Sequence, residues 1–135
     1  KAIANRVKEG MPFLGWSAGS NVACPTIMTT NDMPIVEPPS LKAMHLVSFQ
    51  INPHYTEATI PGHGGESRDQ RIAEYLALNP QMKVVGLREG SLLHVRDGQV
   101  TLRGKEMKLF RSGADFEVIA DGSVLRSDLR PVSGH

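Results

Sequence analysis

The chain has 135 residues, the usual size of one domain and too few for two full-sized cores. Fifteen Lys and Arg residues against fourteen Asp and Glu residues leave a net charge of +1, so no strong positive field attracts nucleic acid or an anionic membrane surface. With 40% hydrophobic and 21% charged residues, the composition is that of a folded globular protein and not of a disordered or fibrous one.

The first half of the chain reads as short helices, strands and one long loop. Residues 1–10 have the pattern of the end of an amphipathic helix that a glycine stops. Residues 11–15 form a short apolar run, which predicts a strand buried on both faces of a parallel sheet. Residues 17–24 predict a short helix, residues 26–40 an extended Pro-rich loop, and residues 45–51 a second strand.

The middle of the chain predicts a parallel crossover. Ser67, followed three places later by Gln70, forms a capping box for a helix with one apolar face. A third buried strand is predicted at residues 83–87. The order strand, helix, strand implies two parallel strands with a right-handed connection, so we predict an α/β fold.

The last third changes to a β-hairpin pattern. Short strands are expected at residues 92–95, 100–102, 107–110 and 116–119. The dipeptide Asp97-Gly98 between the first two predicts a tight hairpin turn. From Leu125 to the end we expect a poorly ordered tail.

Residues 15–19, GWSAG, match the pattern G-x-S-x-G where a predicted strand turns into a predicted helix. This pattern holds a nucleophile on a strained turn, and a side chain at either glycine is expected to clash with neighbouring backbone. We therefore predict Ser17 as a nucleophile and the Ala18 N–H as a donor to an oxyanion. The alternative is a small-residue turn that only packs or binds an anion passively.

A serine hydroxyl needs a base near neutral pH, and the chain has five histidines. His54 is the best placed, because it follows the second predicted strand and active sites gather at the carboxyl ends of parallel strands. His63 lies in a Gly-rich loop, where it is a candidate for contacting substrate. The other three lie within predicted strands or in the tail: His45, His94 and His135.

Two acids compete to orient this base. Glu89 lies two residues past the strand predicted at residues 83–87, so Ser17, His54 and Glu89 all follow the carboxyl ends of successive strands. This convergence favours Glu89. Asp32 lies in the long loop near the Ser17 turn, where it could orient the histidine or line the site. Without the serine and the histidine, either acid would read as a solvated surface carboxylate.

Arg68 and Arg71 lie at the start of the capped helix. A guanidinium near the site would select an acidic group of the substrate through a bidentate pair. Ordinary surface pairs with Asp69 or Glu66 are the alternative, and the spacing does not decide between them.

Other classes of site are not indicated. The single cysteine, Cys24, cannot form an internal disulfide; it suits a reducing compartment and reads as a small buried residue. No group of His, Cys and carboxylates has metal-ligand spacing, and no glycine-rich nucleotide motif is present. No apolar stretch is long enough to span a bilayer. We therefore expect neither a metal nor a cofactor.

Four short segments stand in the order found in one known family. They read GWSAGSN at residues 15–21, TTNDMPIV at 29–36, QINPH at 50–54 and GESRDQR at 65–71. Together they closely resemble the peptidase E family, the bacterial α-aspartyl dipeptidases, which are serine peptidases. The resemblance runs from Met11 to Ile119 in one unbroken order, and four motifs in register are far more specific than the Ser17 turn alone.

The resemblance implies a fold like that of the class I glutamine amidotransferases. This is a flavodoxin-like, three-layer αβα sandwich with a mainly parallel sheet, here ending in short antiparallel hairpin strands. The resemblance also implies cytoplasmic cleavage of dipeptides with an N-terminal aspartate, without a metal or cofactor. Ser17 takes the nucleophile position, His54 the base, and Arg68 the position that reads the aspartyl carboxylate. The family has been described with the acid corresponding to Asp32 and with that corresponding to Glu89; our strand argument prefers Glu89.

Asn21, in the first motif, and His63 complete the residues expected to bind the small peptide substrate. Family members are longer, with further strands and a glycine-containing loop, an expected second oxyanion donor, before the position of Lys1. We therefore expect residues 1–122 to be the C-terminal part of a single peptidase E-like domain and residues 123–135 a tail. The missing N-terminal part is an expected partner, and a homodimer is one candidate for the oligomeric state.

Two alternatives to this function stay open. A cyanophycinase-like hydrolase of β-aspartyl-arginine linkages shares the fold and the serine turn, although the Arg68 motif argues against it. A catalytically silent binding domain of the same fold would bind an aspartyl ligand without turnover. The intact set of Ser17, His54 and an acid argues against this second alternative.

Overall fold

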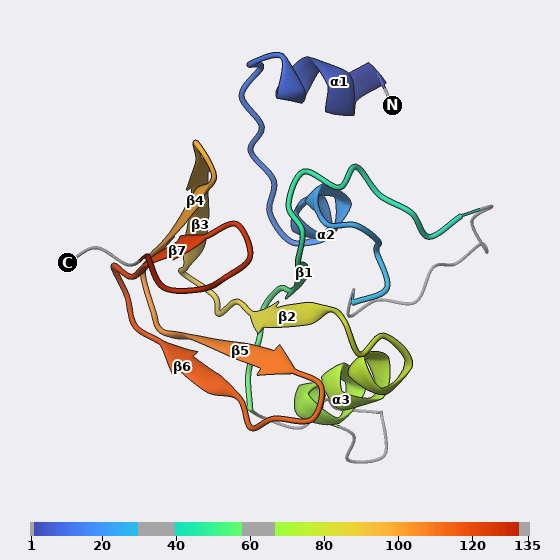
Figure 1. Ribbon diagram of the computed structural model, residues 1–135, viewed down its shortest axis with the longest axis vertical. Helices are drawn as coiled ribbons and strands as arrows, with labels where there is room; N and C mark the ends of the chain where they lie inside the picture. Colours follow the sequence, from blue (N-terminus) through green and yellow to red (C-terminus); the bar gives the residue numbers. More distant parts are fainter. Residues whose placement is uncertain (1, 30–39, 58–66, 133–135) are drawn as a thin grey trace.

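The computed structural model of the chain describes residues 2–29, 40–57 and 67–132 (Figure 1). Its helices are α1 (Ala2–Lys8), α2 (Ala18–Ala23) and α3 (Arg68–Leu78). Its strands are β1 (Gln50–Asn52), β2 (Lys83–Gly86), β3 (Leu92–Arg96), β4 (Gln99–Arg103), β5 (Met107–Arg111), β6 (Glu117–Ile119) and β7 (Val124–Arg126). None of the described helices has the length and apolar character needed to cross a membrane.

The strands form two sheets. β1, β2, β5 and β6 stand in that order in a mixed sheet, in which β1 and β2 are parallel and the other neighbours antiparallel. β3, β4 and β7 form a second, antiparallel sheet. The α/β class is as predicted, but the described sheet is mixed and not mainly parallel. The turn between β5 and β6 is too short for the crossover that a parallel pair requires.

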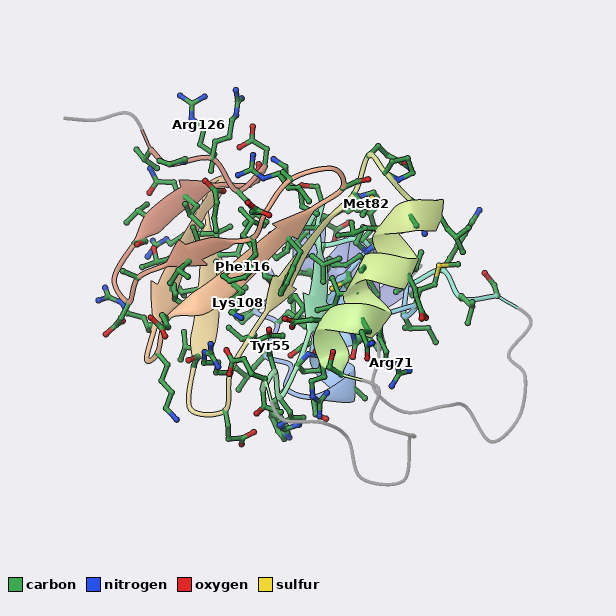
Figure 2. All side chains as sticks on the ribbon, turned by 90° about the horizontal axis from the view of Figure 1, so that it is seen from below. Tyr55, Arg71, Met82, Lys108, Phe116 and Arg126 are labelled. Atoms are coloured by element: carbon green, nitrogen blue, oxygen red, sulfur yellow. The ribbon has the colours of Figure 1, made fainter. Side chains whose placement is uncertain are left out.

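Each face of the mixed sheet has its own cover. On one face, Val84 and Phe110 pack with α3 (Figure 2). On the other face, Val85 and Leu109 share a core with residues of the three-stranded sheet. Neighbouring residues of β2 thus point to opposite sides, as the pleat of a strand requires. Cys24, at the end of α2, shares this second core. In the described residues α3 therefore covers one face of the mixed sheet, and the three-stranded sheet with the end of α2 covers the other, so the expected αβα sandwich is not complete.

The parallel unit in the middle of the chain is confirmed. The Ser67 side chain accepts a hydrogen bond from the Gln70 N–H at 3.2 Å, and the Gln70 side chain accepts one from the Ser67 N–H at 2.7 Å. This capping box begins α3, which returns the chain to β2, parallel to β1. The hairpin of β3 and β4 is also confirmed, with positive φ at Asp97 and Gly98, as a type I′ turn requires.

The strand predicted at residues 11–15 is not present. These residues have no regular structure; Leu14 in the run and Trp16 just after it are 85% and 74% exposed. A strand needs a neighbour that accepts its hydrogen bonds, and none of the described strands pairs with this run. Its apolar composition is that of a buried strand, but the described part of the chain offers it no pairing partner.

The second predicted strand is shorter than residues 45–51. Only its end belongs to β1, because the residues before it use their N–H groups elsewhere. The N–H groups of Met44, His45 and Leu46 donate to carbonyls at the end of α2 and just beyond, at 2.7–3.0 Å. The last carbonyls of a helix have no partner within the helix, so this segment caps α2 and does not form a ladder.

The described residues from Leu125 to Val132 do not form the poorly ordered tail expected from the sequence. β7 pairs with β4, with Leu125 opposite Val100. Leu125 and Leu129 are buried in the core between the two sheets. A three-residue strand carries little sequence signal, and its burial depends on β4 as a partner. The domain boundary expected at residue 122 stays a prediction.

Replacing Ser67 by alanine removes the oxygen that accepts the Gln70 N–H at the start of α3. We expect the free energy of unfolding to fall by about 1 kcal/mol, measured by chemical denaturation followed by circular dichroism. Gln70→Glu keeps an acceptor for the Ser67 N–H and should stay within about 0.5 kcal/mol of the wild type. Equal stability of all three proteins would show that α3 begins independently of this cap.

Candidate active site

Ser17 lies on a strained turn between residues 11–16 and α2, with φ of 53° and ψ of −120°. Such a conformation is uncommon for a residue other than glycine and is found at functional sites whose surroundings hold it. A Cβ atom at Gly15 would lie 2.6 Å from the carbonyl oxygen of Gly19. The backbone on the two sides of Ser17 therefore approaches too closely for a side chain at position 15.

Gly19 does not share this constraint. A Cβ atom there would meet no described atom within 4 Å. The expectation that a side chain at either glycine would clash is therefore correct for Gly15 and wrong for Gly19, which lies inside α2 with open space beside it.

The Ser17 hydroxyl is not used to cap α2. Ser17 is the N-cap residue, but its side chain makes no capping hydrogen bond, in contrast to Ser67 at the start of α3. Ala18 is the first residue of α2, so its N–H has no acceptor within the helix. The turn thus offers a hydroxyl and a backbone N–H on consecutive residues, the two groups that an acyl-transfer site needs.

Buried amide and hydroxyl groups tie α2 to β1. The side-chain amide of Asn21 donates to the carbonyl of Ile51 at 2.8 Å, and the Thr29 hydroxyl donates to the same oxygen at 2.9 Å. Asn21 is almost fully buried, so the amide predicted to contact substrate is used to join two elements. Hydrogen bonds in such a setting are costly to lose because water cannot replace the partner.

Gln50 extends this buried polar layer. Its side chain donates to the Thr26 carbonyl at 3.0 Å and to the Thr29 hydroxyl at 3.1 Å, and it accepts from the Thr26 N–H at 3.0 Å. The segment after α2 is thereby fixed along β1, although it forms no strand there. Thr29 is the last described residue before residues 30–39, which lie outside the described part of the chain and include Asp32.

The structure brings His54 and Glu89 together: Nδ1 of His54 is hydrogen-bonded to Oε2 of Glu89. The contact follows from the register of the parallel strands, in which Asn52 lies opposite Gly86. Two further backbone hydrogen bonds extend this pairing beyond both strands. His54 has a φ of 54°, so the chain turns sharply where it leaves the sheet.

Ser17 and His54 form no hydrogen bond with each other in the described residues. Catalytic hydrogen bonds are often long or unformed in the absence of substrate, and each residue is connected to β1 on its own. Ser17 is linked through α2 and Asn21, and His54 through the chain itself.

The two predicted arginines lie on the first turns of α3. Arg68 is its first residue and is partly buried. Arg71 lines a hollow of about 250 Å³ between α3 and the end of β1, together with Thr29 and Asn52. Both guanidinium groups are therefore carried by the helix that follows the strand of His54.

Two predicted site residues, Asp32 and His63, lie outside the described residues. Cys24 is buried as predicted, and burial raises the pKa of its thiol to about 12, which makes it a poor nucleophile. Within the described ranges, no three His, Cys, Asp or Glu side chains gather as metal ligands.

A charged cluster beside the His54–Glu89 pair is not among the sequence predictions. The Arg88 guanidinium donates to both carboxylate oxygens of Glu57, with 3.0 Å between Nη1 and Oε2. Nζ of Lys108 lies 3.4 Å from the same carboxylate. The Arg88 and Lys108 cations lie 5.3 and 5.6 Å from the centre of the Tyr55 ring. We call Tyr55, Glu57, Arg88 and Lys108 the Glu57 clamp. Its sequence signal is two opposite charges close to two site residues: Glu57 follows His54 by three positions, and Arg88 immediately precedes Glu89.

Comparison with known proteins gives one consistent family. The sequence model of the family described as peptidase family S51 matches residues 1–103 of this chain. A protein named peptidase E from Nostoc sp. strain PCC 7120 is 56% identical over 114 residues, which are 84% of this chain and 47% of that protein. Peptidase E from Shewanella amazonensis is 48% identical over 124 residues, 91% of this chain and 53% of that protein. Peptidase E from Salmonella arizonae is 49% identical over 121 residues, which are 89% of this chain and 53% of that protein. The chain spans about half the length of the curated relatives it matches.

The two glycines of the Ser17 turn provide a matched pair of variants. Gly15→Ala places a methyl group against the Gly19 carbonyl, and we expect it to lower the free energy of unfolding by about 1–3 kcal/mol. Gly19→Ala meets open space inside a helix and should be neutral or stabilising by up to about 1 kcal/mol. Urea unfolding of both variants measures the difference, and equal destabilisation would contradict the close approach at Gly15.

The Glu57 clamp predicts a pH dependence of stability. Hydrogen bonds from Arg88 lower the pKa of Glu57 from its ordinary value of 4.5 to about 2. Because the pKa is lower in the folded state, the clamp stabilises the fold fully above pH 4.5, and this contribution is lost as the pH falls toward 2.

We therefore expect the difference in melting temperature between the wild type and Glu57→Gln to be constant above about pH 5 and to shrink below it. Thermal unfolding between neutral and strongly acidic pH measures this difference. Glu117→Gln is the control, because it removes a carboxylate from a different ion pair, the one with Arg111. A Glu57→Gln difference that does not change with pH would contradict the ion pair.

Proposed function

Because this chain belongs to peptidase family S51, we propose that it forms part of a serine peptidase that cleaves dipeptides with an N-terminal aspartate. The observation that carries the proposal is the hydrogen bond between His54 and Glu89 at the ends of two parallel strands. It supplies an oriented base, and the strained turn supplies a serine hydroxyl that its helix does not use. The relatives named peptidase E support the same reaction class.

In the proposed reaction, Glu89 accepts the Nδ1–H of His54, which leaves Nε2 free to take the proton of the Ser17 hydroxyl. The Ser17 Oγ attacks the aspartyl carbonyl carbon, and the electron pair of the C=O bond moves to the oxygen, to which the Ala18 N–H donates. His54 then protonates the leaving amine as the C–N bond breaks, leaving an ester on Ser17. A water that gives its proton to His54 hydrolyses the ester and releases aspartate.

We assign the substrate carboxylate to Arg68. A guanidinium can bind the aspartyl side chain through two parallel hydrogen bonds, which selects aspartate over a neutral residue. The position of Arg68 at the start of α3 supports the assignment, and the family motif gives the residue. Asp32 is proposed as a further essential acid and His63 as a substrate contact on the sequence alone, with Glu89 as the acid that orients His54.

We also propose that the whole domain has the class I glutamine amidotransferase-like fold, with residues 1–122 as its C-terminal part. The exposed apolar run at residues 11–16 supports this, because a large apolar surface beside a nucleophile needs a cover. The half of the relatives' length that this chain does not span is the proposed cover. The same part is proposed to supply a second oxyanion donor.

A chimera tests the function directly. The part of the Nostoc protein that matches this chain is replaced by this chain, so that the relative supplies the rest of the domain. We expect hydrolysis of α-Asp-Leu, and none of Leu-Leu or β-Asp-Leu. Ser17→Ala should lower kcat/KM by about 10⁴-fold or more. Chromatography of the reaction products measures the rate.

The unaltered Nostoc protein is the positive control. The matched serine variant is Ser48→Ala, because the Ser48 hydroxyl donates to the carbonyl of Ser127, far along the chain, and has no role in the proposed reaction. It should keep wild-type activity. A folded chimera that cleaves none of the three peptides, or one whose activity survives Ser17→Ala, would sink the proposal. Preference for β-Asp-Leu would favour the cyanophycinase-like alternative.

A further inference from the structure

The His54–Glu89 hydrogen bond lies at the surface. The His54 side chain is 49% exposed and the Glu89 side chain 77% exposed, so water competes for both partners. Exposed ion pairs contribute little free energy and do not by themselves hold two side chains in one geometry. A base that is to be oriented by this bond therefore needs support from another part of the structure.

The Glu57 clamp joins the same two chain segments a second time. Glu57 comes three residues after His54, and Arg88 comes immediately before Glu89. Both carboxylate oxygens of Glu57 accept hydrogen bonds from Arg88. Because a bidentate pair fixes orientation as well as distance, it constrains how the segments after β1 and β2 lie relative to each other.

The cations of the clamp are largely buried, in contrast to the His54–Glu89 pair, although the Glu57 carboxylate between them is 52% exposed. The side chains of Arg88 and Lys108 are only 18% and 11% exposed. Nε of Arg88 also donates to the Glu106 carbonyl at 3.2 Å, and Nζ of Lys108 lies 4.1 Å from the centre of the Phe116 ring. Figure 2 shows Tyr55, Lys108 and Phe116 following one another on this side of the sheet. The clamp is thus anchored to β5 and the residues next to it.

Tyr55 fixes the segment after β1 to the sheet and to α3. A Cβ atom at Gly86 would lie 2.6 Å from the Tyr55 ring, so the ring lies directly on the β2 backbone. The Tyr55 hydroxyl donates to Oδ1 of Asp69 in α3, and its N–H donates to the Leu87 carbonyl at 2.9 Å. The residue that follows His54 therefore has three separate attachments.

We propose that Glu57 and Arg88 are positioning residues: their ion pair holds the two segments so that His54 presents its Nδ1–H to Glu89 and keeps Nε2 as a proton acceptor. Both act through the His54–Glu89 pair and not on the substrate. The inference rests on the proposed function, since this tautomer matters for catalysis only if Ser17 is the nucleophile. The tautomer itself is a property of the pair and can be measured without turnover.

Nitrogen-15 NMR of the imidazole rings of this chain tests the proposal. At about pH 8, above the ordinary pKa of an imidazole, the two ring nitrogen shifts show which nitrogen carries the proton, and His54→Gln assigns the signals. We expect His54 of the wild type to carry its proton on Nδ1. In Glu57→Gln and in Arg88→Lys this preference should be lost, because a lysine cannot form the bidentate pair.

Glu117→Gln is the matched control. It removes a carboxylate that also pairs with an arginine, Arg111, but at the other end of the mixed sheet, where Arg111 lies opposite Lys83. It should leave the His54 tautomer unchanged. In a Glu89→Gln background, Glu57→Gln should change the His54 signals no further, because the residue through which it acts has already lost its charge.

The proposal is overturned if His54 of the wild type lacks the Nδ1–H preference, if folded Glu57→Gln and Arg88→Lys proteins retain it, or if Glu117→Gln loses it equally. If Glu57→Gln does not fold, the tautomer measured in Arg88→Lys, which keeps the positive charge, tests the proposal alone. In the chimera, Glu57→Gln should lower kcat for α-Asp-Leu by about 10-fold to 100-fold without raising KM. An inactive chimera with an intact tautomer effect would reject the peptidase function and leave the positioning role standing.

Discussion

The register between β1 and β2 places Asn52 opposite Gly86 in a parallel pair, so the chain leaves both strands at the same edge of the sheet. His54 and Glu89 lie just beyond these two points, and their hydrogen bond follows from the register. A slip by one residue would turn every side chain of the strand to the other face. The candidate site therefore depends first on backbone pairing and only then on the chemistry of its side chains.

Two kinds of buried contact hold the exposed groups. The Ser17 turn has a strained backbone, and the helix after it is tied to β1 through the buried amide of Asn21. The segments that carry His54 and Glu89 are joined a second time by the Glu57 clamp, whose cations are largely buried. In both cases a reactive group lies at the surface while polar contacts to largely buried groups fix its backbone, although the Glu57 carboxylate itself is 52% exposed; such an arrangement favours a preorganised site.

The local elements that could be predicted are those whose signals lie within a few residues. The capping box of Ser67 and the turn at Asp97-Gly98 are both present, because side-chain chemistry and positive φ are local properties. The strand predicted at residues 11–15 is absent, since the described part of the chain contains no strand that pairs with it. The first residues of the strand predicted at 45–51 are not a strand, because the N–H groups of His45 and Leu46 cap α2. The strand β7 was not predicted, because its burial depends on a distant strand.

The sequence by itself determined the family, the α/β class and the candidates for nucleophile, base and acid, because short motifs and strand ends carry that information in chain order. Only the tertiary structure decided which acid contacts His54 among the described residues, that Gly15 but not Gly19 is sterically required, and that Asn21 is used to join α2 to β1. It also revealed the Glu57 clamp. These features are contacts between segments far apart in sequence, and such contacts exist only once the strands have paired.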